Sequence, residues 1–263
     1  MHISEKKYNE LLWGSKTWEE IRACSKKGFI PVLPLGSIEQ HGPMLPVECD
    51  WFLAHSWCLE GAYKASAKGV KVLVLPAIPY GVSIEHIDFS GTLTLHCDTY
   101  IRMIQDISRN IIRAGFNKLV YVSGHGGNMV PLQTAVRELK LELKEKGQKK
   151  IQLYIADDKN CFNENEKIYN VINQKQFDFH ASAVETSYYL FMKPELVRKN
   201  KMTRPKVKCS RTPAYAWFTK KDITESGASG DPSVATKDWG AKIFEYKSLK
   251  LAEFLNNIFK NKI

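Results

Sequence analysis

Four short apolar segments recur along the chain, and they constrain its fold more than any other feature. They occupy residues 29–35, 70–78, 117–124 and 150–156. Continuous apolar runs of this length are typical of strands buried on both faces, as in a parallel sheet. We therefore expect these segments to form the strands of one sheet.

Helical patterns fill the intervals between and after the apolar segments. The predicted helices span 51–68, 98–114, 129–146, 181–192 and 237–260. Asp50 and Asp98 stand where the first two would begin, and aspartate is a favoured N-cap residue. The alternation of strands and helices predicts a doubly wound α/β sheet with helices on both faces.

The domain organisation predicted from the sequence is simple. The chain contains no linker, internal repeat or low-complexity block, so a single domain over residues 1–263 is expected. Three long segments, 76–97, 157–180 and 203–236, lie largely outside the predicted elements. Irregular segments of this length in a compact domain are usually functional. Open α/β sheets bind ligands at the carboxyl ends of their strands, so we expect these segments to surround a site there.

Composition limits the environment and the partners. No apolar run reaches the roughly 18 residues of a membrane span, and the N-terminal segment lacks the apolar region of a secretory signal. Six cysteines without a CxxC pair indicate reduced thiols, so we expect a cytoplasmic protein. The net charge of +10 is spread along the chain without a nucleic-acid-binding motif. We interpret it as a solvated surface and expect neither nucleic acid nor membrane as partner.

The loop after the first predicted strand concentrates side chains that bind metals. It reads GSIEQHGPMLPVECD, residues 36–50. Glu39 and His41 are two positions apart, so in an extended segment they point the same way, and Asp50 follows nine residues later. Carboxylate oxygens together with an imidazole nitrogen suit a divalent ion such as zinc or manganese. Taken alone, these residues also fit an ordinary polar loop.

The second motif, SGHGGN at residues 123–128, follows the third predicted strand. His125 is expected at the carboxyl end of that strand. Gly126 and Gly127 let the backbone approach a ligand closely, and their N–H groups suit an anion or a developing oxyanion. Asn128 is expected to order the loop or to contact substrate. Alone, the motif is also compatible with a phosphate-binding turn.

The third motif, FHASAVETSYYL at residues 179–190, opens a predicted helix. His180 precedes that helix, where it is either a functional group or an N-cap. Glu185 lies one turn inside among apolar residues, and such a carboxylate needs a positive partner, either a metal or a salt bridge. In the long loop 76–97, His86 is a candidate for substrate contact as well as a plain loop residue.

All three motifs fall at strand-to-helix junctions of one predicted sheet, so their side chains can converge. A shared metal site explains them together better than three separate roles do.

These motifs, in this order, resemble the creatininase (creatinine amidohydrolase) family. The match consists of GSIEQHGPMLPVECD, YGVSIEHIDFSGTLTL, SGHGGN, HASAVETS and GASGDPSVAT, and it spans nearly the whole chain. The resemblance implies a three-layer α/β/α sandwich with a mostly parallel central sheet. It also implies two divalent ions (zinc, manganese or iron) and a homo-oligomer, commonly a hexamer in this family.

The resemblance also implies a distribution of ligands. Glu39, Asp50 and His125 would hold one ion, and His41 and Asp50 the other, so that Asp50 bridges. In creatininase an acidic residue lies two positions after the histidine that corresponds to His125, and it completes the coordination of the second ion. This chain has Gly127 there, and Glu185 is the candidate replacement.

The chemistry implied is hydrolysis. Two close cations convert a shared water into a hydroxide that attacks a carbonyl. His180 passes a proton to the leaving group, Glu185 assists at the second ion, and the amides of Gly126 and Gly127 or a metal hold the oxyanion. We therefore expect a metal-dependent hydrolase that cleaves a C–N bond of a small cyclic amide or formamide through a metal-bridging hydroxide.

Several alternatives stay open. Within the family these are a peptide-trimming enzyme and a C–C hydrolase that opens a cyclic diketone, as in inositol breakdown. Creatinine itself is not favoured, because creatininase has a tryptophan four residues before its catalytic histidine where this chain has Gln176. From other classes, a phosphate-binding module predicts no bound metal, and a structural metal protein predicts a closed site without a water position.

Overall fold

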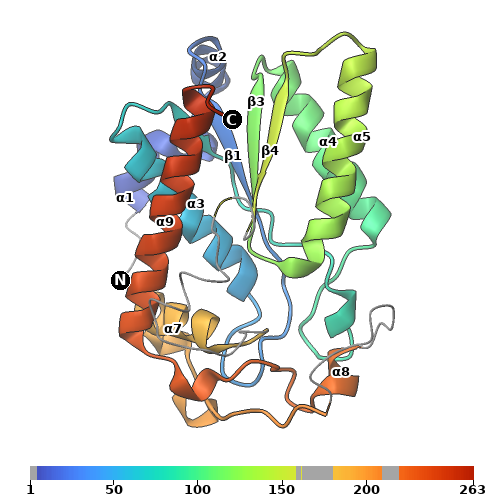
Figure 1. The fold of residues 1–263 in the computed structure, drawn as a ribbon, viewed down its shortest axis with the longest axis vertical. Coiled ribbons are helices and arrows are strands. Elements are labelled where there is room, and N and C mark those ends of the chain that lie inside the picture. The colour runs from blue at the N-terminus through green and yellow to red at the C-terminus, as the bar shows by residue number, and fades with distance from the viewer. Residues whose placement is uncertain (1–4, 158–160, 162–179, 209–218) are drawn as a thin grey trace.

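The predicted strands pair in parallel in one sheet (Figure 1). The computed structural model describes residues 5–157, 161, 180–208 and 219–263. Within them the strands are β1 (Ile30–Leu35), β2 (Val72–Val74), β3 (Lys118–Ser123) and β4 (Gln152–Ala156). Their order is β2-β1-β3-β4, and the four strand predictions are confirmed.

The strand order creates a switch point between β1 and β3. From β1 the chain crosses to β2 on one side, whereas from β3 it crosses to β4 on the other. Loops that leave two neighbouring strands in opposite directions open a crevice at their carboxyl ends, which is where open α/β sheets bind ligands. The first two sequence motifs follow β1 and β3, so both lie at this crevice.

Helices account for most of the remaining chain. They are α1 (Glu5–Tyr8), α2 (Trp18–Lys26), α3 (Cys49–Ser66), α4 (Cys97–Arg113), α5 (Met129–Glu145), α7 (Ala183–Met192), α8 (Lys220–Ile223) and α9 (Lys237–Phe259). The five predicted helices are confirmed, with ends shifted by two residues at most. None of the helices in the described ranges is both long enough and apolar enough to cross a membrane.

The two predicted aspartate caps are wrong. Helix α3 has Glu48 at its N-cap position and α4 has His96, so Asp50 and Asp98 lie within the first turn. An acidic residue in the first turn is still favoured by the helix dipole. For Asp50 the reason for the difference is tertiary, because its carboxylate is directed at buried histidines described below.

The sequence analysis did not predict α2, whose start nevertheless carries a local signal. The Thr17 side chain accepts from the Glu20 amide, and the Glu20 carboxylate accepts from the Thr17 amide. This reciprocal pair is a capping box, and it satisfies two backbone donors that the helix itself leaves free.

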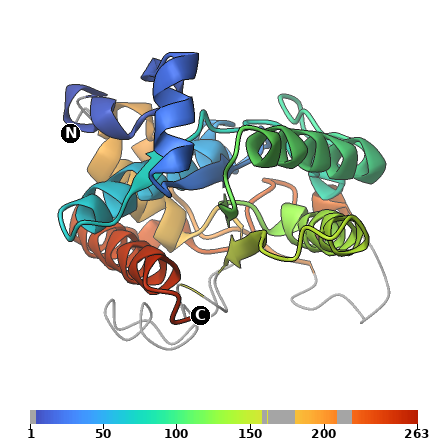
Figure 2. The ribbon, with the colours of Figure 1, turned by 90° about the horizontal axis from the view of Figure 1, so that it is seen from above.

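Helices cover both faces of the sheet (Figure 2), which confirms the three-layer α/β/α arrangement. Because side chains alternate along a strand, Val32 and Val120 face α3 and α9. Leu33 and Leu119 face the opposite way, towards α2, α4 and α5. The two faces thus form separate apolar clusters, and the strands are buried on both sides.

A further apolar cluster fixes α7 against the starts of α3 and α9. Tyr188 and Tyr189 of α7 are fully buried in it, beside Phe52 and Trp57 of α3. Burial of large aromatic side chains contributes strongly to packing. This cluster therefore determines where the third motif lies relative to the switch point.

The crossing of α7 and α9 generates a prediction about stability. A Cβ on Gly240 of α9 would lie 1.9 Å from the Ser187 carbonyl oxygen of α7. Gly240→Ala should therefore lower the free energy of unfolding by about 1–3 kcal/mol, the usual cost of overpacking. Urea denaturation followed by circular dichroism measures the change.

Gly14→Ala is the matched control, because a Cβ there would meet only Pro76 Cγ, at 3.7 Å. It should leave the free energy of unfolding unchanged or raise it by less than about 1 kcal/mol. Equal stabilities of the two variants would contradict the tight crossing.

Candidate metal centre

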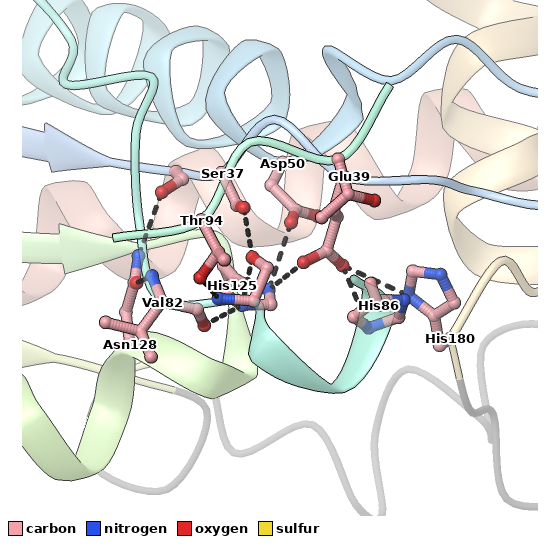
Figure 3. Close-up of polar contacts among 12 residues, drawn as sticks. Ser37, Glu39, Asp50, Val82, His86, Thr94, His125, Asn128 and His180 are labelled. Atoms are coloured by element: carbon pink, nitrogen blue, oxygen red, sulfur yellow. Dashed lines mark hydrogen bonds and ion pairs between the residues drawn. The ribbon is translucent and has the colours of Figure 1, made fainter. Parts of the chain in front are cut away.

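The candidate site lies where the loops after β1 and β3 meet the first turn of α3 (Figure 3). Glycines make this approach possible. A Cβ on Gly36, directly after β1, would lie 2.1 Å from Trp51 Cα of α3. A Cβ on Gly124, directly after β3, would lie 2.5 Å from the Asp50 carbonyl oxygen. Both strand ends therefore need glycine to pack against α3.

Asp50 is the centre of the cluster. Its Oδ1 lies 3.1 Å from His41 Nε2, and its Oδ2 lies 3.0 Å from His125 Nδ1. The Asp50 carboxylate thus joins the β1 loop to the β3 loop, with one oxygen facing each imidazole. The expected bridging of two ions by Asp50 stays a prediction.

Glu39 faces the same nitrogen of His125 as Asp50 does (Figure 3). Its Oε2 is 3.2 Å from His125 Nδ1. Its Oε1 is 3.3 Å from His180 Nδ1 and 3.5 Å from His86 Nε2. The structure therefore brings His86 and His180, from two distant segments, to one carboxylate oxygen.

The backbone fixes the tautomers of the two central imidazoles. His125 Nε2 lies 2.8 Å from the Val82 carbonyl oxygen, and His41 Nδ1 lies 3.1 Å from the Glu39 carbonyl oxygen. Each of these nitrogens donates a hydrogen bond, because a carbonyl oxygen only accepts. In the neutral imidazoles, His125 Nδ1 and His41 Nε2 then carry lone pairs directed at the carboxylates. Metal-ligating histidines are oriented in this way.

Unsatisfied polar atoms show that these residues fit a cation. Four buried atoms of this cluster have no hydrogen-bond partner among the described residues, namely Glu39 Oε1, Glu39 Oε2, His41 Nε2 and Asp50 Oδ2. Burying a carboxylate without compensation is costly. Ligand atoms of Glu39, Asp50 and His125 lie within 4.8 Å of one another, as do those of His41, Cys49 and Asp50. A divalent ion in each group would satisfy these atoms.

The pKa shifts within the cluster also favour a bound cation. Burial raises the pKa of Glu39 to about 7, although His125 opposes the shift. Burial alone would lower the pKa of His125, but Glu39 and Asp50 raise it to about 10. Burial would also raise the pKa of Asp50, yet His41 and His125 hold it well below its usual range. The carboxylates thus require positive charge between them, which protons or metal ions can supply.

Gln40 connects the site loops, and the sequence analysis missed it although it lies inside the first motif. Its Nε2 is 2.7 Å from His86 Nδ1 and donates to the Gly227 carbonyl oxygen at 3.1 Å. Its Oε1 accepts from the Gly42 amide at 2.9 Å. A Cβ on Gly227 would lie 1.9 Å from this Oε1, and Gly227 has a φ of +82°. Only glycine fits there, and the packed amide of Gln40 explains why.

His180 is held as a neutral imidazole. Burial, followed by the charge of His41, lowers its pKa well below the usual value. Its Nε2 lies 2.7 Å from the Gln40 carbonyl oxygen and donates to it, so Nδ1 carries the lone pair. The next residue, Ala181, has a φ of +56°, which is strained for a residue with a Cβ. Strain of this kind persists where surrounding contacts fix the backbone.

His86 is buried beside His180, with ring centroids 4.2 Å apart. Burial, with a smaller contribution from Lys220, lowers the pKa of His86 to about 2. Lys220 is a second residue that the sequence analysis missed. Its Nζ donates to Ser229 Oγ at 3.4 Å, and no carboxylate of the described residues forms an ion pair with it. Its positive charge lies on this side of the site, where it interacts with the carboxylates of Glu85, Glu39 and Glu185.

Glu185 has two contacts, a capping hydrogen bond that the sequence analysis did not expect and an approach to His41. Its Oε2 accepts from the Ser182 amide at 3.1 Å and closes the capping box of α7. Its Oε1 lies 3.7 Å from His41 Nε2. The carboxylate is therefore near the His41 side of the centre, and its role as a ligand stays a prediction.

Asn128 orders the site loops, and its expected substrate contact stays a prediction. This side chain is fully buried, its Oδ1 accepts from the Val82 amide at 2.9 Å, and its Nδ2 donates to the Gly36 carbonyl oxygen at 2.9 Å. Because the amide is bonded to backbone on both sides, it orders two loops, which is the other role expected for it.

The two glycines of the second motif differ in their surroundings. A Cβ on Gly127 would lie 2.2 Å from the Val82 carbonyl oxygen and 2.5 Å from His125 Nε2. A Cβ on Gly126 would meet nothing within 4 Å. No side chain fits at position 127 in this conformation, and the oxyanion role of both amides stays a prediction. Gln176, which bears on creatinine, lies outside the described residues.

Comparisons with known proteins identify a family. A family model described as "Creatininase: Creatinine amidohydrolase" matches residues 15–255. A mycofactocin precursor peptide peptidase of Mycobacterium ulcerans is 28% identical over 219 residues, which cover 81% of this chain and 79% of that protein. A creatinine amidohydrolase of Pseudomonas putida is 31% identical over 137 residues, 48% of this chain and 51% of that protein.

The fold is also shared with a solved structure. The structure titled "Creatininase Mn" aligns with a TM-score of 0.85 and 22% identity, over 95% of this chain and 98% of that chain. At this level of identity the alignment demonstrates a common fold.

The bridging position of Asp50 generates a prediction about metal content. In Asp50→Ala the two groups of candidate ligands that contain Asp50 each lose a member, whereas the third group, Glu39, His41 and His180, is unchanged. We expect about two equivalents of divalent metal in the wild-type protein and a loss of most of both in the variant. Elemental analysis after dialysis against metal-free buffer measures this. Retention of one full equivalent in Asp50→Ala would contradict the bridge.

The two glycines provide a second prediction. Gly127→Ala should displace His125 and weaken metal binding by about 10- to 100-fold, as occurs when groups supporting a ligand are changed. Gly126→Ala adds the same methyl group in open space and should leave metal affinity unchanged. Metal titration by calorimetry compares the two variants, and equal affinities would argue against support of His125 by this turn.

Proposed function

The chain belongs to the creatininase family, and from this premise we propose that it is a metal-dependent hydrolase that cleaves a C–N amide bond. The observation that carries the proposal is the pair of imidazole lone pairs and the unpartnered carboxylate oxygens around Asp50. The family match covers nearly the whole chain, which supports one domain over residues 1–263.

We assign the ligands from the contacts described above. Glu39, Asp50 and His125 would hold one ion, and His41 and Asp50 would hold the other with Glu185 within reach. When bound, two divalent ions (zinc, manganese or iron) would supply the Lewis acidity that activates water near neutral pH and polarises a carbonyl oxygen.

His180 is the group best placed to move a proton. Its Nε2–H is committed to the Gln40 carbonyl oxygen, so only Nδ1 can accept a proton, and this atom faces Glu39. A low pKa makes the protonated imidazole a strong acid. We infer that His180 Nδ1 takes up a proton from the attacking water and delivers it to the leaving nitrogen, and that Gln40 keeps the imidazole in the tautomer that can do so.

The substrate class follows from what the relatives share. The peptidase relatives align with most of this chain, and creatinine amidohydrolase with about half. Both names describe cleavage of an amide bond. A short peptide is therefore a candidate substrate, together with the small cyclic amide and the formamide expected from the sequence. Opening of a cyclic diketone is the second candidate, because it begins with the same attack on a carbonyl.

The geometry does not favour a phosphate-binding module. The SGHGGN loop directs the His125 lone pair at two buried carboxylates, Glu39 and Asp50. A phosphate placed against these groups would meet like charge, which costs energy at short range.

Activity of the metal-loaded protein tests the proposal. We expect turnover of at least one class in a panel of cyclic amides, N-formyl amines, short peptides and cyclic ketones. His180→Gln should lower kcat by about 10²- to 10⁴-fold, the usual contribution of a proton-transferring group. Its metal content should be unchanged.

His96→Gln is the matched control, because His96 is exposed on α4 and should not affect turnover. Wild-type rates in His180→Gln would contradict the proton-transfer role. Turnover of cyclic ketones alone would favour the C–C hydrolase. No turnover in a fully metal-loaded protein would favour a structural metal.

A further inference from the structure

Cys49 is the first residue of α3 and directly precedes Asp50. It is completely buried. Its ligand atom lies within 4.8 Å of those of His41 and Asp50, all three residues being buried. From the sequence alone, this thiol is only one of the expected reduced cysteines. The structure places it beside the candidate metal centre.

The surroundings of the thiol distinguish it from an ordinary core cysteine. The Cys49 thiol lies beside polar groups, and it experiences the charges of His41, Glu185 and Asp50. His41 Nε2 is fully buried, has no hydrogen-bond partner in the described ranges, and lies 3.1 Å from Asp50 Oδ1. Cys58, by contrast, lies in the apolar cluster between α3 and the sheet.

The chain contains an internal comparison for this position. Helix α4 also opens with Cys-Asp, at Cys97 and Asp98. There the cysteine is exposed and belongs to none of the candidate metal groups found in the described residues. The same dipeptide at the same helical position therefore has no metal-binding surroundings in α4, so helix-start preference alone does not explain the placement of Cys49.

The candidate ion site at His41 has fewer nearby carboxylates than the candidate ion site at His125. Around His125 two carboxylates, those of Glu39 and Asp50, lie within 3.2 Å of one nitrogen. Around His41 only Asp50 is that close, whereas Glu185 is 3.7 Å away and its other oxygen is bonded to Ser182. A further donor is needed to complete a four-coordinate site.

We propose that Cys49 Sγ is a ligand of the ion held by His41 and Asp50. The inference rests on the metal centre of the proposed function and deepens it. Binding would release the thiol proton and create one sulfur–metal bond, as metal binding to cysteine generally does. A thiolate donor selects zinc, iron(II) or cobalt(II) over manganese or magnesium. The two halves of the centre then differ, with a nitrogen–oxygen set at His125 and a sulfur-containing set at His41.

Cobalt(II) spectroscopy tests the proposal. The metal-free protein is loaded with cobalt(II), and its near-ultraviolet spectrum is recorded together with bound cobalt per chain. We expect a thiolate-to-cobalt charge-transfer band in the wild type and in Cys97→Ser, and its loss in Cys49→Ser. Competition between zinc and manganese should show the zinc preference of Cys49→Ser reduced by about 10- to 100-fold, a change typical for groups around a metal site.

X-ray absorption of the zinc-loaded wild type supplies a test that needs no variant, in case Cys49→Ser does not fold. A zinc–sulfur distance of about 2.3 Å is expected. Two bound equivalents with only nitrogen and oxygen neighbours, or with no charge-transfer band, would overturn the role of Cys49 and leave the metal centre standing. Failure to bind any metal would overturn the proposed centre itself, and the inference with it.

Discussion

The buried carboxylate of Asp50 is the constraint on which the rest of the site depends. Removing it from water is costly unless positive groups meet both oxygens. Those groups are His41 and His125, which arrive on loops leaving neighbouring strands in opposite directions. The first turn of α3 adds a favourable helix dipole. These three side chains can meet only because of three features together: the strand order of the sheet, the glycines at the strand ends and the position of the start of α3.

Neutral amides hold the charged groups in place. The Asn128 side chain bonds to backbone 46 and 92 residues away. The Gln40 amide reaches backbone 187 residues away. Because both side chains are uncharged, they fix the loops without adding charge to a cluster that already contains buried carboxylates. The histidines consequently keep defined tautomers, and each directs a chosen nitrogen towards the centre.

The sequence predicted what depends on local pattern. The strands followed from apolar runs, and Glu39, His41, Asp50 and His125 from their spacing and their position after strands. The N-cap role of Asp50 was wrong because a local cap preference was outweighed by a distant imidazole. The roles of Gln40 and Lys220 could not be predicted, since glutamine and lysine carry no distinctive local pattern and both act through contacts formed only in the folded chain.

The geometry separates metal binding from substrate selection. Glu39, Asp50 and His125 face one another, so under the proposed function they would determine where an ion binds. All three are buried, so bulk solvent has little access to their side chains. Discrimination between substrates would then come from groups on the His180 side, where Lys220 brings a positive charge. One cluster of candidate ligands could thus serve different substrates, because it would fix the proposed reaction while the segments around it would determine what can approach.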